Sequence, residues 1–527
     1  MKHLFLSVLL FCSIFSFSQN QNLSNGFVFD GEPYLSVNPN NSQHIVVAWM
    51  GYQASNLIVI KTRVSFDAGN TWSTKYNVPH TVSGYQSADP SIAFDNNGNV
   101  FLCFIDYTPS PAAGAVYVSK STDGGLNWGN PVEVINVNSD PGKQPVDRPW
   151  MVIDNSGGIN DGNIYVTTMN PNVFGPVSPP FNPYFIKSID GGASFEPWRY
   201  LDTTNYEAGS LIPQPMPTPC VSSNGTFHAI YPSYVFSQSP FAQYFVSTST
   251  NAGTSFNYNV VLQSANAAND TLAKKGYLLI SNPSDANHLC FVYPNFDNGD
   301  IDIYITESLN AGNTWSSPIR VNDDPIANNK MQDLMWADFD NDGDLVVTWR
   351  DRRNAPDSTY TTDSEIYGAV RWKESTNFSS NFSISDALVS HDTILEESGN
   401  DFMCVNMIND TLYVVWGDVR NTRLNIWFER IDLATGGTYI QDLNLNTAPI
   451  NVYPNPAKST VTIDLGSNNL KESKLDVVDL NGKIVQTVSD INNTVVFLDL
   501  QNLPAGNYFI KFSNNKGTET FPIQKID

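Results

Sequence analysis

Short apolar runs separated by polar turns recur along most of this chain. The runs are rich in Val, Ile, Tyr, Phe and Trp, and Gly, Asn and Asp fill the segments between them. Such runs are typical of β-strands joined by tight hairpins. Seven units follow one another between about residues 32 and 442, and each is predicted to hold four strands. The first strands are expected at 33–37, 90–94, 149–153, 219–222, 277–281, 334–339 and 402–407.

A second pattern marks the hairpin between the third and fourth strands. A Ser is followed by Asp or Asn two residues on, by Gly two further, and by an aromatic residue three after that. The five copies begin at Ser65, Ser121, Ser188, Ser249 and Ser308, and an eroded sixth copy begins at Ser375. The Asp or Asn is expected to accept from a backbone NH two residues on, the Gly to supply a positive φ, and the aromatic ring to pack across the hairpin. The Asp and Asn positions 67, 123, 190, 251 and 310 lie 56 to 67 residues apart, so one supersecondary unit is used repeatedly.

This repeat resembles the Asp-box, or BNR repeat, of sialidases and related β-propellers. The resemblance implies an all-β fold, a seven-bladed propeller with six blades as the alternative, in which the boxes are structural and lie away from the active face. Radial repetition leaves only short, protected sheet edges. An array of β-sandwiches would not place a box at the same point of every unit. The ring is expected to close by pairing of Asn25–Asp30 with Thr438–Leu443.

Both ends of the chain differ from the repeats. An apolar run from Leu4 to Phe17 after Met1, Lys2 and His3 predicts a signal peptide over residues 1–19, with the propeller over 20–445. No later stretch is long and apolar enough to span a bilayer. The formal net charge of −24 argues against nucleic-acid binding, and a soluble, exported monomer is expected. Four scattered cysteines in apolar runs are expected to be buried free thiols: Cys103, Cys220, Cys290 and Cys404.

The last segment, residues 446–527, has its own signature. It opens with Tyr453-Pro454-Asn455-Pro456-Ala457, continues through Asp479-Leu480-Asn481-Gly482-Lys483, and ends with a strand that begins at Leu503-Pro504-Ala505-Gly506. These motifs resemble the type A C-terminal sorting domain of the type IX secretion system of Bacteroidetes. The resemblance implies a small Ig-like β-sandwich that routes the protein to the exterior or the outer cell surface. Alternating apolar strands with Gly and Asn turns favour a sandwich independently.

Chemistry-bearing residues gather at the strand ends opposite the boxes. The starts of first strands carry Glu32, Asp89, Asp147, Arg148, Asp333 and Asp401, and the ends of second strands carry Asp106, Tyr107, Tyr293, Arg350, Asp351, Arg352, Arg353, Asp418 and Arg420. The guanidinium fork binds carboxylates in a bidentate way, so the arginines are candidate ligand-binding residues for an acidic glycan: Arg148, Arg350, Arg352, Arg353 and Arg420. Each of them also has an acidic neighbour in the sequence. Salt bridges between blades are therefore the alternative interpretation.

The resemblance to sialidases implies a defined catalytic set. That family uses three arginines, a Tyr nucleophile assisted by Glu and an Asp acid/base, and it departs from the usual pair of carboxylates. The candidate catalytic residues are Asp89, Glu207, Asp333, Glu365 and Tyr367, with Arg148, Arg350 and Arg420 as the arginine triad. The first unit reads Gly31-Glu32-Pro33-Tyr34 and lacks the arginine of the family's Phe-Arg-Ile-Pro motif. Two functions stay open: a surface module that binds a glycan or a protein without catalysis, and an exo-glycosidase acting on acidic glycans.

An acidic turn lies at the box end of the sixth unit. Asp338, Asp340, Asp342 and Asp344 alternate there like the start of a calcium loop. The twelfth position of an EF-hand loop would be Trp349 rather than Glu. Calcium is one interpretation and an ordinary acidic hairpin turn is the other, and no further cofactor is expected.

Overall fold

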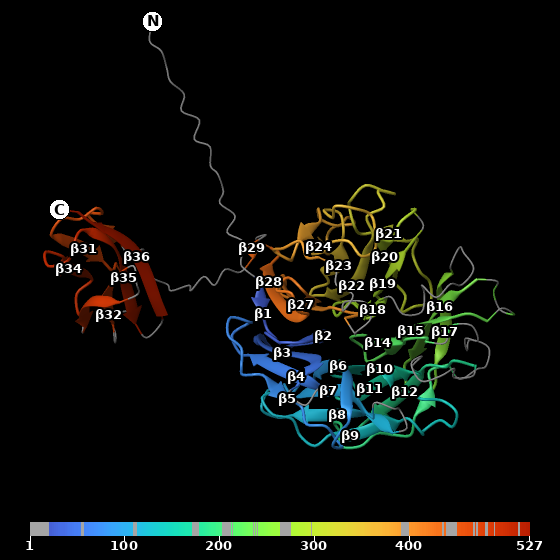
Figure 1. Ribbon diagram of the computed structural model, residues 1–527. Helices are drawn as coiled ribbons and strands as arrows, with labels where there is room; N and C mark the ends of the chain where they lie inside the picture. Colours follow the sequence, from blue (N-terminus) through green and yellow to red (C-terminus); the bar gives the residue numbers. More distant parts are fainter. Residues whose placement is uncertain are drawn as a thin grey trace, which may run out of the picture. The chain divides into compact units, whose positions relative to one another are not determined.

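Seven antiparallel sheets make up the described part of residues 1–438 in the computed structural model, and they follow one another around a ring (Figure 1). The structure describes residues 20–434, 437–438 and 451–526, apart from 54–56, 109–112, 171–178, 203–211, 213, 236, 238, 240, 264–275, 297, 391–399, 467–469, 471–472, 480–482, 490 and 515–516. The predicted signal peptide, the predicted domain boundary at 445/446 and the candidate Glu207 lie outside these residues. Every sheet in this part has its strands in sequence order, apart from the seventh.

The strands of the first three sheets are β2 (Asp30–Asn38), β3 (Asn41–Tyr52), β4 (Ile58–Ser65) and β5 (Tyr76–Asn77); β6 (Gln86–Phe94), β7 (Val100–Tyr107), β8 (Gly114–Ser121) and β9 (Val132–Asn136); and β10 (Asp147–Ile153), β11 (Ile164–Met169), β12 (Tyr184–Ser188) and β13 (Arg199–Tyr200). The next three are β14 (Thr218–Val221), β15 (Phe227–Ser233), β16 (Gln243–Ser249) and β17 (Asn257–Gln263); β18 (Leu278–Ser281), β19 (Leu289–Asn295), β20 (Asp302–Ser308) and β21 (Ile319–Arg320); and β22 (Gln332–Phe339), β23 (Leu345–Asp351), β24 (Glu365–Arg371) and β25 (Phe382–Ser383). The predicted first strands match these elements to within a few residues.

The seventh sheet joins the two ends of the repeat region. It contains β26 (Cys404–Ile408), β27 (Thr411–Asp418) and β28 (Asn425–Asp432), with β1 (Gln21–Asn22) and the short β29 (Gly437–Thr438) both paired to β28. Gln21 lies opposite Phe428, and Leu23 NH donates to Ile426 O at 2.8 Å. The predicted closure by Asn25–Asp30 against Thr438–Leu443 is not seen in the described residues, since Phe29 bridges to Leu424 and Thr438 pairs with Ile431, and residues 439–443 lie outside them. The N-terminal segment does complete the last sheet, but with earlier residues and a different partner strand, because β28 already has a free edge there.

The five repeat turns share one hydrogen-bond pattern. In each, the Ser hydroxyl donates to the Asp or Asn side chain, the Gly NH donates to the Ser oxygen, and the NH four residues after the Asp or Asn donates to its side chain, at 2.8–3.0 Å in the turn of Ser188. The other four turns repeat these bonds. The predicted acceptor relation two residues on is thus wrong, and the relation is four residues on. The sixth copy lacks the Gly, and Ser375 bonds to the backbone carbonyl of Asn377 instead.

Each repeat turn packs against the preceding sheet of the ring. A Cβ atom at Gly253 would lie 2.3 Å from the Phe185 ring, and one at Gly69 would lie 2.5 Å from the Phe428 ring of the seventh sheet. The aromatic residues follow the same rule, since Phe256 packs on Phe185 with ring centroids 5.3 Å apart. The predicted contact within the same hairpin is also present in two copies, where Trp72 and Trp315 donate from Nε1 to Gly69 O and Gly312 O of their own turns. Only Gly permits so close an approach of backbone to ring at a positive φ.

The innermost strands surround an axial cavity. Residues of β2, β6, β10, β14, β18, β22 and β26, one strand from each sheet, line a cavity of about 360 Å³. This radial arrangement is that of a β-propeller. Aromatic rings from four sheets meet at one side of the cavity, where Trp150 lies 5.6, 5.5 and 5.2 Å from the ring centroids of Tyr34, Trp336 and Phe402. The four predicted free cysteines are confirmed as buried and unbridged.

Residues 439–527 form a separate unit with two sheets around one core. One sheet contains β30 (Asn451–Tyr453), β31 (Thr460–Asp464) and β34 (Val495–Asp499), and the other contains β33 (Ile484–Ser489), β32 (Lys474–Asp479), β35 (Gly506–Asn514) and β36 (Gly517–Lys525). Val461 and Ile463 of the first sheet pack in one cluster with Leu475, Val477 and Ile510 of the second. Two sheets that share a core make the predicted β-sandwich. Within the described residues of the whole chain, no helix is long and apolar enough to cross a membrane.

The turn contacts predict a stability difference between two glycines. Gly253→Ala places a Cβ atom against Phe185 at a φ of 75°, and it should lower the free energy of unfolding by roughly 2–4 kcal/mol through overpacking and backbone strain. The matched control is Gly84→Ala, with a φ of 88° and nothing within 4 Å of the added atom, which should cost only about 1 kcal/mol. Urea unfolding of both variants measures the difference. Equal losses would contradict a packing role for the turn.

Candidate functional site at the axis of the propeller

Four innermost strands break their pairing at the same place. In four sheets, the innermost strand shifts in register against its neighbour in the same sheet, near the start of the innermost strand. These innermost strands are β2, β6, β10 and β22. One residue at each break has a left-handed backbone, with φ of 51° at Glu32, 52° at Asp89, 51° at Arg148 and 52° at Leu334. This conformation costs a residue other than Gly about 1–3 kcal/mol, and such residues gather at functional sites. The bulge therefore fixes where three charged side chains leave the backbone.

These three residues and Asp401 form what we term the axial ion cluster. Arg148 makes an ion pair with Asp401, and its Nη2 lies 3.9 Å from Glu32 Oε1. The backbone NH of Arg148 donates to Asp89 Oδ2 at 3.2 Å. Its guanidinium also lies 5.3 Å from the centre of the Phe402 ring. The cluster thus joins the first, second, third and seventh sheets at the side of the aromatic rings that carries the strand starts.

Burial gives the cluster unusual protonation. Glu32 is only 2% exposed, and its pKa is raised well above the usual value because of burial and because Asp89 and Asp401 repel its charge, against the attraction of Arg148. As a carboxylate, its Oε2 has no hydrogen-bond partner among the described residues. As a carboxylic acid, it can donate to the neighbouring Asp89. Burial would lower the pKa of Arg148, but Glu32, Asp89 and Asp401 outweigh burial and raise it. Arg148 therefore stays a cation, and Glu32 keeps its proton to a higher pH than an ordinary Glu does.

Asp333 is held by two of the predicted ligand-binding arginines. Arg350 Nε and Nη2 each lie 2.7 Å from one oxygen of Asp333, and Arg352 Nη1 lies 3.0 Å from its Oδ1. Burial would raise the pKa of Asp333, but the two guanidinium groups hold it far below the usual range. A carboxylate with no proton to give is a poor general acid. The geometry therefore disfavours the predicted catalytic role of Asp333.

The remaining arginines are paired in the same way. Arg353 Nη2 lies 2.9 Å from Asp351 and its Nη1 2.7 Å from Asp323, while Arg420 Nη2 lies 2.6 Å from Asp418 and its Nη1 pairs with Asp386. The triad of Arg148, Arg350 and Arg420 thus has three separate sets of carboxylate partners. Salt bridges are present: Arg148–Asp401 is an example of the alternative interpretation, salt bridges between blades, whereas Arg350–Asp333 lies within one sheet. A clamp on a substrate carboxylate would have to break them.

Glu365 and Tyr367 are brought together by a third residue. Asn354 Nδ2 donates to Glu365 Oε2 at 2.7 Å and to the Tyr367 hydroxyl at 3.0 Å. Burial raises the pKa of Tyr367. A nucleophilic phenol needs a lowered pKa, so this arrangement disfavours the predicted nucleophile.

A Ser, a His and an Asp also meet near the start of β6, and of these the sequence pattern pointed only to Asp106. Ser87 Oγ and Asp106 Oδ1 lie 3.0 and 2.9 Å from the same nitrogen, His80 Nδ1. A catalytic triad needs the base and the orienting carboxylate on opposite ring nitrogens. The constellation therefore orders a loop and cannot activate the serine.

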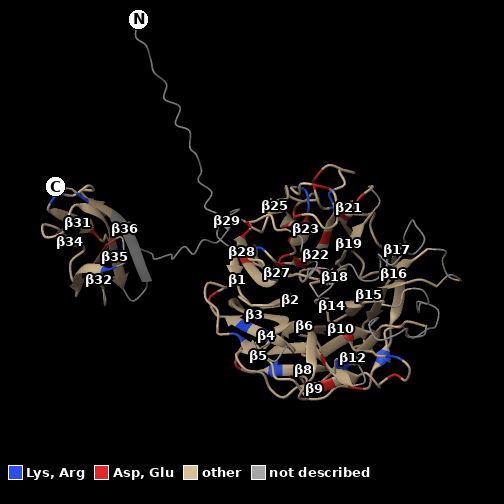
Figure 2. Ribbon diagram, viewed as in Figure 1, with Lys and Arg blue, Asp and Glu red and all other residues tan. Residues whose placement is uncertain are grey.

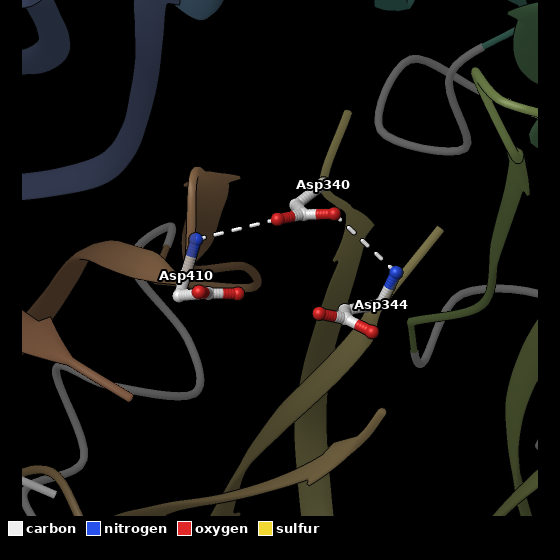
Figure 3. Close-up of side chains that lie close together, drawn as sticks. All are labelled: Asp340, Asp344 and Asp410. Carbon is white, nitrogen blue, oxygen red and sulfur yellow. Dashed lines mark hydrogen bonds between the residues drawn. The ribbon is translucent and has the colours of Figure 1, made fainter. Parts of the chain in front are cut away.

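Only two of the four predicted acidic residues, Asp340 and Asp344, belong to the acidic group in the structure. Asp340 and Asp344 lie with Asp410, from the turn between β26 and β27, with one oxygen of each within 4.8 Å of the others (Figure 3). Asp340 already accepts from the NH groups of Asp342, Gly343, Asp344 and Asp410. Asp342 instead pairs with Lys373. These bonds account for an acidic hairpin turn, and calcium stays a prediction.

Asp338 faces away from this turn. It accepts from Met407 NH at 3.0 Å and lines the axial cavity, where burial raises its pKa to about 7. It is therefore not part of the group that could hold a cation.

Comparison with known proteins identifies the C-terminal unit. Residues 451–525 match the secretion system C-terminal sorting domain. This tail directs secretion through the type IX system to the cell surface or the extracellular space. The predicted localisation and the predicted handling by that secretion machinery are confirmed.

Solved structures resemble the propeller in fold. One is a protein of unknown function from Dyadobacter fermentans, at 14% identity over 67% of this chain and 96% of that one, with a TM-score of 0.44. Others are an α-L-arabinanase of Penicillium chrysogenum (12% identity, 77% and 98% coverage, TM-score 0.41) and the NanB sialidase of Streptococcus pneumoniae (13%, 80% and 71%, 0.38). The comparison with curated proteins gives no match. The all-β propeller fold is confirmed, and these likenesses concern the fold alone.

The raised pKa of Glu32 predicts a pH-dependent stability. Between the usual Glu pKa of 4.5 and the raised value, the folded state holds a proton that the unfolded state has lost. Stability should therefore fall as the pH rises, by about 1.4 kcal/mol per pH unit from this group. Glu32→Gln removes the titration but keeps a donor toward Asp89. The difference in unfolding free energy between wild type and variant should change from pH 4 to pH 7, and a constant difference would show that Glu32 does not carry the shift.

Proposed function

We propose that this protein is a secreted glycan-binding propeller and that the axial ion cluster is its binding centre. The observation that carries the proposal is the left-handed bulge repeated at Glu32, Asp89 and Arg148. It holds charged groups from three sheets at one point at a cost in backbone energy. Three carboxylates, Asp89, Asp147 and Asp401, are partly exposed there, and carboxylate oxygens accept from hydroxyl groups.

The charge of the cluster favours the class of glycan. Four carboxyl groups lie around a single guanidinium, because Asp147 also acts on Arg148. Even with Glu32 protonated, the formal charge stays negative. A glycan carboxylate would be repelled, whereas neutral or amine-bearing sugars offer the hydroxyl and ammonium donors that these oxygens accept. This modifies the expectation of an acidic glycan at this end of the propeller.

One observation favours catalysis as the second candidate. Glu32 carries a proton beside the Asp89 carboxylate, and such a pair of unlike carboxyl groups is the usual acid and base of glycoside hydrolysis. The arginines that an acidic substrate would need are already paired. A hydrolase in this family of folds would therefore act here on neutral glycans.

Binding can be tested with one isosteric substitution. Asp89→Asn keeps an acceptor for the NH of Arg148 but removes a charge from the cluster, so affinity for a bound neutral or amino-sugar oligosaccharide should fall at least tenfold. The matched control is Asp342→Asn, whose side chain is 50% exposed at the box end. Affinity electrophoresis against a glycan panel measures both variants. Unchanged binding by Asp89→Asn would overturn the proposal.

Catalysis is separated by a second measurement. Release of a fluorescent aglycone from neutral and acidic glycosides should be absent if the protein only binds. If release occurs, and Glu32→Gln abolishes it while Arg350→Ala does not, the result supports Glu32 as the general acid. Loss in Arg350→Ala with a folded protein would instead support an arginine clamp.

A further inference from the structure

A pocket lies where the first and seventh sheets meet, and we term it the seam pocket. It encloses about 800 Å³ and is lined in part by Phe27, Phe29, Tyr52, Gln53, Lys61 and Lys75. Backbone bonds fix its walls, since Asp30 NH donates to Leu424 O at 3.0 Å and Tyr52 NH donates to Phe29 O at 3.2 Å. β2 begins and β3 ends beside it, so it opens at the strand ends opposite the repeat turns. Its size is that of a small-molecule or oligosaccharide site.

Lys75 lines the seam pocket, Arg63 acts on it from beside the lining, and among the described residues neither makes an ion pair of the kind that the axial arginines make. Lys75 Nζ donates to the backbone carbonyl of Ser24 at 2.6 Å, and Arg63 Nη1 donates to that of Leu23 at 3.0 Å. Lys61 lies 2.7 Å from Asp30, the carboxylate of this group. Burial lowers the pKa of Lys75, and Lys61 and Arg63 lower it further, against the attraction of Asp30. Three neighbouring cations thus share one acid.

A fourth cation lies at the rim. The Arg423 guanidinium is 5.2 Å from the centre of the Phe27 ring. The sheet of β3, β4 and β5 accordingly shows basic positions in Figure 2. The chain has a net charge of −24, so this local excess of positive charge stands out. An anion bound here would be attracted electrostatically, which favours the free energy of binding.

The walls of the seam pocket are aromatic and accessible. Phe27 is 82% exposed and Tyr52 is 37% exposed, and Tyr52 packs edge-to-face on Phe29 with ring centroids 6.1 Å apart. Exposed rings beside cations suit a ligand with both an apolar face and negative charge. A sugar ring presents CH groups on one face, and its substituents can carry carboxylate or sulfate groups.

We propose that the seam pocket binds an anionic glycan, a polysaccharide whose sugars carry carboxylate or sulfate groups. Lys75 and Arg63 supply the charge, Lys61 stays fixed by Asp30, and Tyr52 and Phe27 contact the sugar faces. This site is separate from the axial ion cluster and does not depend on the function proposed for it.

Titration calorimetry tests the seam pocket with three probes: trigalacturonate, a sulfated galacto-oligosaccharide and neutral galactotriose. At least one anionic probe should bind, the neutral one should not, and affinity should fall as salt rises from 50 to 500 mM through screening of the exposed charges. Lys75→Glu should weaken anionic binding at least tenfold. The matched control is Lys143→Glu, because Lys143 also donates to a backbone carbonyl, at 2.9 Å from Pro180 O.

The results distinguish a glycan anion from a lipid surface, and the seam pocket from the axial ion cluster. Absence of anionic binding, equal weakening by the control, or binding of galactotriose with the same affinity would each overturn the proposal. Binding to phosphatidylglycerol vesicles without binding to either sugar anion would also overturn it, in favour of a lipid surface. Tyr52→Ala, which changes no charge, should weaken sugar binding as well. Asp89→Asn should leave anionic binding unchanged, so failure of this proposal is distinguishable from failure of the axial one.

Discussion

The contact between each repeat-turn glycine and the preceding sheet is the interaction on which the ring depends. A hairpin whose Ser and Asp satisfy its own backbone can present a glycine to a neighbour without leaving unpaired NH groups. Because the glycine has no side chain, the ring or branched side chain of the preceding sheet fills the space. Repeated around the axis, this contact sets how close successive sheets lie. Gly69 applies the same contact to Phe428, so the first sheet joins the last by the contact that also joins the second to fifth sheets to the sheets before them.

The repeat turns lie at one end of the strands, and the charged side chains gather at the opposite end. The turn end consists of backbone-satisfying Ser, Asp and Asn residues, and its acidic group at Asp340 follows the same principle. At the opposite end the strand starts meet at the axis, above a layer of aromatic rings that separates them from the axial cavity. Ionic groups are costly there, since they lose water on burial. The structure offsets that cost by matching Arg148 with several carboxylates and by keeping a proton on Glu32.

Charge pairing divides the surface of this end into two kinds of site. Around the axis, each arginine that the sequence suggested as a ligand contact is already bound by a carboxylate, and the excess charge is negative. At the seam, Lys75 and Arg63 donate to backbone carbonyls instead, and these carbonyls do not neutralise their positive charge. Two sites of opposite sign on one secreted propeller suit a polysaccharide with both neutral and anionic sugars.

Much of the architecture was determined by the sequence alone, because it rests on local chemistry. Apolar runs with Gly and Asn turns located the strands, the spacing of the Ser-Asp-Gly repeats gave the period, and the motifs from Tyr453 to Gly506 identified the sorting domain that residues 451–525 confirm. Sorting residues by strand end also placed Glu32, Asp89, Arg148 and Asp401 on one side. What only the tertiary structure decided is which of these side chains meet. Strand starts hundreds of residues apart, such as Arg148 and Asp401, become neighbours through ring closure, and β1 pairs with β28 rather than with the strand expected. The pairing of arginines with acids likewise depends on distances of a few ångströms, which no residue pattern specifies.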